Sequence, residues 1–281
     1  MKSLITLFLI LSLYTSLAQT SISYRVLEDN PEQANTNFIA PEFGMEYNST
    51  DIGIFLGANG RKDLSIFTAE GIARFDIYSL NSSGTFHLEG GLFLPLSSKE
   101  KQKEVPVFLS YNPYAGRTYE NNKAYNIEET KFITIPSGKY KNEFGLRGGL
   151  HYRAVGIEGE IEGVGTGKVN LGGIYLGGQM TSQAFVRTII NDDVERIGAG
   201  FTRIYADVMI LPLSELSADP LSAVAKPDGM IGWRLGYQWY VSPHEGEYKF
   251  FGNSVFGAEI GQRPLSGFMF NLYWALAFSR S

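Results

Sequence analysis

The sequence predicts an all-β chain that folds as a transmembrane antiparallel up-and-down β-barrel of about twelve strands, within a range of roughly ten to fourteen. Three observations lead to this prediction. The last strand alternates large apolar residues with small or polar ones along its whole length. Glycine is abundant, with 32 residues, and aromatic residues make up 14% of the chain, which is typical of β-structure. The mean hydropathy is near zero, as expected when strands are apolar on one side only.

The N-terminus has the three parts of a secretory signal peptide. Lys2 supplies a positive charge, an apolar stretch follows from Leu4 to Leu13, and the small residues Ser16 and Ala18 precede a cleavage site. We therefore predict a signal peptide at residues 1–18 and an outer-membrane barrel at 38–281. Between them, residues 19–37 are predicted to form a periplasmic tail, an extra edge strand or a piece folded into the lumen.

The final strand carries the most information. Its odd and even positions point to opposite faces of a sheet. The intervening residues are mostly small or weakly polar, whereas the water-facing side of a soluble sandwich would favour Lys, Glu and Thr. The sequence therefore predicts a lipid-facing row, which consists of Phe268, Phe270, Leu272, Trp274, Leu276 and Phe278.

The same alternation recurs along the chain, with charges on one parity and bulky apolar residues on the other. The predicted strands span 38–47, 51–58, 66–79, 84–96, 105–112, 131–153, 157–164, 170–190, 197–211, 229–241, 252–263 and 267–279. Charges on the other parity would line a polar barrel interior, where they can pair. The lumen-lining candidates are Arg147, His151, Arg153, Glu158, Glu160, Arg203, Arg234 and Glu259.

One predicted hairpin places charges directly opposite one another. If Val155-Gly156 is the turn, Arg153 faces Glu158 and His151 faces Glu160. Two interpretations stay open. The pairs form a ladder that neutralises lumenal charges, or His151 and Glu160 form an acid–base site.

The loops predict how the barrel is oriented. If both chain ends are periplasmic, the two longest connections, 113–130 and 212–228, lie outside the cell, while short ones near 97–104 and 154–156 lie inside. The loop 113–130 is rich in Tyr and Asn and could contact sugar or protein.

Composition excludes several kinds of site. The chain has no cysteine, so thiolate metal sites and cysteine nucleophiles are excluded. A net charge of −5 gives no electrostatic basis for binding nucleic acid. The chain has only three histidines, His87, His151 and His244. A three-histidine metal site is not expected, because His244 would lie in a periplasmic connection while the other two lie inside the barrel. We also predict no other metal site, no cofactor and no catalytic residue.

The signal peptide, the repeated amphipathic strands and the final strand from Phe268 to Phe278 resemble the outer-membrane β-barrel superfamily. The run Phe-Gly-Leu-Arg-Gly-Gly-Leu-His-Tyr at 144–152 is similar to strands of such proteins from Bacteroidota-type bacteria. The resemblance implies a location in the outer membrane of a Gram-negative cell, with the lipid bilayer and the barrel-assembly machinery as partners. The chain departs from the family at its end, since Ser279-Arg280-Ser281 follow the last aromatic residue.

Three functions remain open on the sequence. The chain could be a structural scaffold that docks a surface or periplasmic protein. It could instead be a small-bore channel for small solutes or ions. The third alternative is a lipid-modifying enzyme, such as a hydrolase or acyltransferase, although no serine is placed clearly beside His87 or His151. The sequence favours the scaffold and a non-enzymatic role, because mixed charges in a narrow barrel indicate a cross-linked interior.

Overall fold

A computed structural model describes residues 22–34, 37–49, 51–80, 82–120, 123–157, 167–192, 194–216, 230–242, 254–263 and 267–277. Within these ranges the only helical element is the short 3-10 helix η1 (Pro31–Gln33). No helix in the described ranges is long and apolar enough to cross a membrane. The strands are β1 (Tyr24–Asp29), β2 (Phe38–Asn48), β3 (Ile52–Leu64), β4 (Phe67–Ser79), β5 (Ser82–Glu120), β6 (Lys123–Ile157), β7 (Gly167–Ile190), β8 (Val194–Leu216), β9 (Ile231–Ser242), β10 (Ser254–Arg263) and β11 (Gly267–Leu276).

The strands form one antiparallel sheet that closes on itself. Each strand from β2 to β11 pairs with its neighbours in sequence, and β11 pairs back to β2. The remaining strand, β1, pairs only with β7 among the described strands. The predicted fold class, an antiparallel up-and-down barrel, is therefore confirmed, and the 11 strands of the sheet fall within the range that the sequence allowed.

Apolar side chains point outward from the barrel wall, and most polar side chains point into the lumen. On β11, Phe268 and Leu272 point outward and are each 44% exposed, while Met269, Asn271 and Tyr273 point inward and are buried. Phe270, Trp274 and Leu276 share the outward parity, and Phe278 lies outside the described residues. The other strands repeat this pattern, with outward rows such as Trp233 and Leu235 on β9. An apolar exterior around a polar interior is the side-chain distribution of a transmembrane β-barrel.

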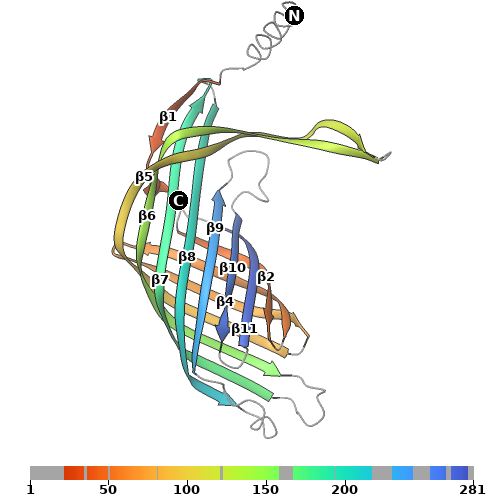
Figure 1. Ribbon diagram of the computed structural model, residues 1–281, viewed down its shortest axis with the longest axis vertical. Coiled ribbons are helices and arrows are strands. Elements are labelled where there is room, and N and C mark those ends of the chain that lie inside the picture. The colour runs from red at the N-terminus through yellow and green to blue at the C-terminus, as the bar shows by residue number, and fades with distance from the viewer. Residues whose placement is uncertain are drawn as a thin grey trace, which may run out of the picture.

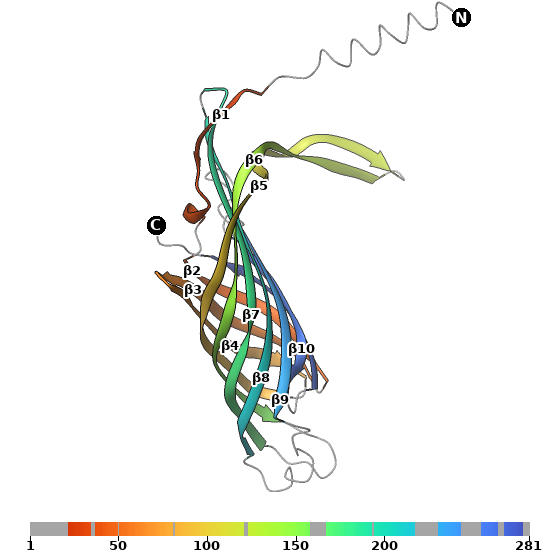
Figure 2. The ribbon, with the colours of Figure 1, turned by 60° about the vertical axis from the view of Figure 1, so that its left-hand side comes forward.

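Strands β5 and β6 continue beyond the barrel as a two-stranded arm, which we define as residues 97–140 (Figures 1 and 2). The sequence predicts separate strands at 84–96 and 105–112 with a turn at 97–104, and this prediction is wrong. The charged stretch between them stays paired with β6, for example Lys99 with Asn142 and Glu100 with Lys141. A charged run can continue a ribbon because the side chains of residues 97–104 are exposed on both faces, so charge alone does not mark a turn.

Because β5 is continuous, the loop 113–130 lies at the opposite end of the barrel from the one predicted. That loop is the outer part of the arm, and the arm leaves the barrel at the end where β1 and the start of β2 lie (Figure 1). The arm therefore projects from the end of the barrel at which the described chain begins, at residue 22, and ends, at residue 277. The prediction that it lies at the opposite end is wrong. The connection 212–228 begins within β8, and residues 217–229 lie outside the described ranges.

Strand β1 occupies a place that β6 leaves empty. β6 pairs with β7 up to Tyr140, opposite Ala184, and then turns away into the arm. β1 takes over the free edge of β7 from Val186 to Ile190. The backbone N–H of Lys139 donates a 2.8 Å hydrogen bond to Asp29 Oδ1, which joins β1 to the base of the arm. Within the segment 19–37, residues 24–29 thus form an extra strand, which is one of the alternatives that the sequence leaves open.

The hairpin predicted around Val155-Gly156 is also wrong. Both residues lie within β6, where Val155 pairs with Val169 and Gly156 pairs with Lys168. Arg153 therefore faces His87 on β5 and Leu171 on β7, and His151 faces Glu89 and Gly173. Glu158 and Glu160 lie outside the described residues. The predicted turn failed because a single small residue after a valine is compatible with a strand as well as with a turn.

Candidate functional site: a filled lumen and a projecting arm

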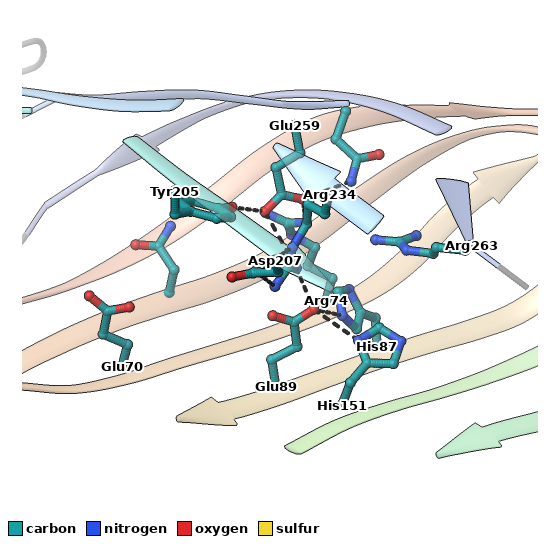
Figure 3. A network of polar contacts seen from close by, with 12 residues as sticks. Glu70, Arg74, His87, Glu89, His151, Tyr205, Asp207, Arg234, Glu259 and Arg263 are labelled. Carbon is teal, nitrogen blue, oxygen red and sulfur yellow. Dashed lines mark hydrogen bonds and ion pairs between the residues drawn. The ribbon is translucent and has the colours of Figure 1, made fainter. Parts of the chain in front are cut away.

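The centre of the lumen is an arginine held by acids from three other strands (Figure 3). Arg234 on β9 donates to Asp207 Oδ2 on β8 through Nε and Nη2, at 3.1 and 2.8 Å. Its Nη1 donates to Glu89 Oε1 on β5 at 2.6 Å and lies 3.9 Å from Glu259 on β10. The side chain of Arg234 is fully buried, so these carboxylates supply the compensation that a buried charge requires.

Glu259 connects this centre to the β2–β4 side of the barrel. Its Oε2 accepts hydrogen bonds from Arg74 Nη1 and Asn271 Nδ2, both at 3.0 Å. Its Oε1 accepts a hydrogen bond from the hydroxyl of Tyr205. Arg74 also pairs with Glu42. A continuous chain of charge-assisted hydrogen bonds thus crosses the lumen between β2 and β10.

Two further acids each collect several cations. Glu46 pairs with Arg153 Nη2 at 2.6 Å and with Arg263 Nη1 at 3.0 Å. Glu70 pairs with Arg203 Nη1 at 2.7 Å and accepts from Gln179 Nε2 at 3.0 Å. Arg61 and Arg147 lie farther from Glu70, at 3.5 and 3.9 Å. In the described part of the lumen, the buried arginines are thus matched by carboxylates of nearly equal number.

Aromatic rings fill the space between the ion pairs. Tyr205 lies under Arg147, with 4.0 Å from the guanidinium carbon to the ring centroid. Three of the buried tyrosines sit opposite a glycine on the next strand, namely Tyr175 with Gly149, Tyr205 with Gly236 and Tyr273 with Gly257. A Cβ atom on Gly236 would lie 2.0 Å from the Tyr205 ring, and one on Gly257 would lie 2.0 Å from the Tyr273 ring. These glycines therefore let the rings lie flat against the barrel wall.

A small cavity lies within the lumenal network. A lumenal cavity bounded by Arg61, Glu70, Glu89, Arg147 and Arg203 has a volume of about 10 Å³. That is room for about one water molecule. A barrel of about ten strands has a narrow interior that side chains can fill, and arginine and tyrosine are large enough to do so. In the described residues the lumen is thus occupied by a cross-linked network of side chains.

The structure places most predicted lumenal residues in this network. Arg147, His151, Arg153, Arg203, Arg234 and Glu259 all point inward and are buried, and each contacts at least one oppositely charged or hydrogen-bonding partner. Their partners differ from those that the predicted hairpin implied. Arg153 pairs with Glu46, which lies more than a hundred residues earlier in the chain, and His151 contacts Glu89.

The pattern did not single out several members of the network. Arg263 and Tyr175 have central roles, yet only the parity of their strands could have indicated that they point inward. Their partners depend on the register between strands far apart in sequence, which alternation alone does not fix.

The arm is the second candidate site. Its base is anchored by a small apolar cluster of Val105 and Val107 from β5, Ile135 from β6, and Ala184 and Val186 from β7. Farther out it has no other strand beside it in the described structure, and large side chains are exposed on it. These are Tyr114 (76%), Tyr119 (72%), Phe132 (58%), Tyr125 (48%) and Ile127 (45%). Exposed aromatic residues on a ribbon with two open edges form a surface suited to protein contact.

Comparison with known proteins gives no family. No protein-family model matches the chain, and no curated protein matches it. Among solved structures, a variant of the Rhodopseudomonas blastica porin with three substitutions is 9% identical, with a TM-score of 0.18. The alignment covers 92% of this chain and 100% of that porin chain. A variant of the same porin with five substitutions is 7% identical, with a TM-score of 0.19 and the same coverage. At these TM-scores the likeness carries no argument about function.

Proposed function

We propose that the protein is a closed outer-membrane β-barrel that anchors its arm at the membrane and presents it to a protein partner. The filled lumen is the observation that carries this proposal. Buried ion pairs from β2 to β10 cross the interior, and a lumenal cavity beside Arg61, Glu70 and Arg203 has a volume of only about 10 Å³. A hydrated ion or sugar would have to break several of these pairs to pass, at a cost of several kcal/mol for each uncompensated charge. A scaffold role therefore fits the interior better than a channel does.

The outer membrane of a Gram-negative, Bacteroidota-type cell is the location that we propose for this barrel. The exposed outward rows of Phe, Leu and Trp support a lipid environment, because soluble proteins rarely expose apolar surface of this extent. The predicted signal peptide and the resemblance of residues 144–152 support export to that membrane. The arm leaves at the end of the barrel where the described chain begins and ends. In bacterial barrels both chain ends face the periplasm. We therefore infer that the partner is periplasmic.

One experiment separates the scaffold from the channel. Purified, folded protein in planar bilayers should give no steady conductance, because the lumenal network leaves no path. In parallel, a variant whose residues 113–130 are replaced by an Asn-Gly turn should be purified from the membranes of native cells. We expect a protein that co-purifies with the wild type to be lost from this variant, while both stay folded on an unboiled gel. Steady single-channel currents from the wild type would contradict the scaffold.

The inferred side of the arm predicts a labelling pattern. The chain has no cysteine, so single cysteines can be introduced without background. Tyr119→Cys near the tip of the arm should react with a membrane-impermeant maleimide only after the outer membrane is permeabilised. Leu80→Cys is the matched control, because Leu80 is 58% exposed in the turn after β4 at the opposite end of the barrel. It should react in intact cells. Labelling of Tyr119→Cys but not Leu80→Cys in intact cells would place the arm outside the cell.

A further inference from the structure

The arm has two free edges, and the edge formed by β5 is interrupted. Among the described strands, β5 and β6 pair only with each other along the arm, so each has one open side there. The open side of β5 contains Pro106 and Pro113. The register shifts after Phe108 and after Asn112 also place extra residues on β5. Prolines and bulges both hinder the addition of another strand, so this edge is protected.

The free edge of β6 is regular by comparison. From residue 123 to residue 135 the strand has no proline, and the extra residues of this stretch lie on β5. It includes Ile127, Thr130 and Ile133, which are β-branched residues that favour strands. Both views show the arm running sideways away from the barrel, where another molecule can reach it (Figures 1 and 2). A regular open edge is a template for a further strand.

The charges along this edge are complementary to those of a second copy. If two β6 edges pair antiparallel about a two-fold axis at Thr130, Glu129 of each chain faces Lys131 of the other. On the same face, Ile127 of each chain faces Ile133 of the other. Opposite charges and β-branched residues that face each other across an antiparallel pair stabilise it. Glu129 and Lys131 already share one face, since they lie 3.3 Å apart, and their side chains are 49% and 57% exposed.

Neighbouring registers lack this complementarity. Facing residues must point to the same side of the sheet, so in a two-fold pairing one residue always faces its own copy. An axis at Glu128, Glu129 or Lys131 would bring like charges face to face, which destabilises the pair. An axis at Phe132 would set Glu129 and Lys131 opposite isoleucines. Of the positions from 128 to 132, Thr130 is therefore the one that gives both charges an opposite partner.

We propose that two copies of the protein associate through the β6 edges of their arms, with Thr130 of each chain on the two-fold axis. The two arms then form one four-stranded antiparallel sheet. The inference goes beyond the proposed function, because the arms pair without any further protein. Tyr114 and Tyr119 of β5 lie away from the paired edge and stay exposed for another partner.

Disulfide formation at the axis tests the register. Facing residues of an antiparallel pair have Cα atoms about 4.5 to 5.5 Å apart, a distance that a disulfide spans. The purified, full mature chain with Thr130→Cys is reconstituted into phosphatidylcholine vesicles, oxidised mildly and run on a non-reducing gel. We expect most of it to form dimers. Thr134→Cys is the matched control, because Thr134 is exposed on the same face of β6 but lies about 26 Å from its own copy in this register. It should stay monomeric.

Charge reversal tests the pairing between chains. In the Thr130→Cys background, Glu129→Lys places two lysines face to face and Lys131→Glu places two glutamates face to face. Each change should lower the dimer yield by about 5-fold or more. A mixture of the two variants restores opposite charges between chains, although the pair within each chain stays broken. The mixture should therefore form heterodimers, identified by tags of different length, at the yield of Thr130→Cys alone.

An unboiled gel confirms that each variant is folded, and all four substitutions lie in the arm, outside the barrel wall. Equal dimer yields from Thr130→Cys and Thr134→Cys, or a mixture that forms no heterodimer, would overturn the proposal. Because the vesicles contain no other protein, this result is independent of the co-purification experiment. Failure of the arm dimer therefore leaves the scaffold function standing, and failure of the scaffold function leaves the dimer standing.

Discussion

Arg234→Met is expected to lower the free energy of unfolding by about 3–5 kcal/mol. The substitution keeps most of the side-chain volume but leaves Glu89 and Asp207, both buried, without their closest cation. Arg147 remains 3.5 Å from Asp207 and compensates only part of the loss. The measurement is equilibrium unfolding in urea in detergent or lipid, followed by fluorescence of the three tryptophans, which lie on β9 and β11.

Arg187→Met is the matched control for this prediction. Arg187 pairs with Glu28 at 3.5 Å and Glu195 at 3.4 Å, but its side chain is 42% exposed. Because water and salt screen such pairs, its loss should cost about 1 kcal/mol or less. If Arg234→Met costs no more than this control, the lumenal network does not stabilise the barrel, and the description of the lumen as a cross-linked interior fails.

The sequence predicts which residues point into the lumen better than it predicts which residues they contact there. Parity along a strand separates inward from outward residues, and it places Arg147, Arg203 and Glu259 correctly inside. Partners depend on which strands are neighbours and in what register. The predicted turn at Val155-Gly156 shifted that register, so Arg153 was assigned to Glu158 instead of Glu46. A pattern with a period of two contains no information about pairings between β2 and β6.

The arm shows a second limit of pattern reading. Five of the eight residues from 97 to 104 are charged, and the sequence predicts a short connection there between two strands. Their pairing with residues 138–143 is decided by the partner strand, which carries complementary residues such as Lys141 opposite Glu100. The chain therefore has fewer and longer strands than the alternation suggested. The number of strands within the ring still falls in the predicted range.

Gly236→Val is expected to prevent folding, or to destabilise the barrel by at least about 3 kcal/mol. The Tyr205 ring occupies the position of the new side chain, with a Cβ contact of 2.0 Å, and the ring is held there by Glu259 and Arg147. The tyrosine cannot move without breaking those contacts. The measurement is the fraction of refolded protein that migrates as a compact band on an unboiled gel, together with urea unfolding of any folded material.

Gly90→Val is the control, since a Cβ at Gly90 would meet no atom within 4 Å. It should fold and change stability by about 0.5 kcal/mol or less. A double variant provides a second check on the cause. Tyr205→Ala removes the ring, so Gly236→Val should cost much less in that background than in the wild type. If Gly236→Val lowered the free energy of unfolding equally in both backgrounds, contact with the Tyr205 ring would not be the reason that position 236 needs glycine.

The unbroken passage of β5 and β6 from the barrel wall into the arm has a mechanical consequence. Hydrogen bonds between strands run perpendicular to the strand axis. A force that pulls the arm along its strands therefore places many of these hydrogen bonds in shear at the same time. Hydrogen bonds from β5 to β4 and from β6 to β7 would share that load along the pairings at residues 86–93 and 140–157. Arm and wall thus act as one stiff tether. Tension applied by a partner at the tip would be transmitted through the backbone to the strands that carry His87, Glu89 and His151.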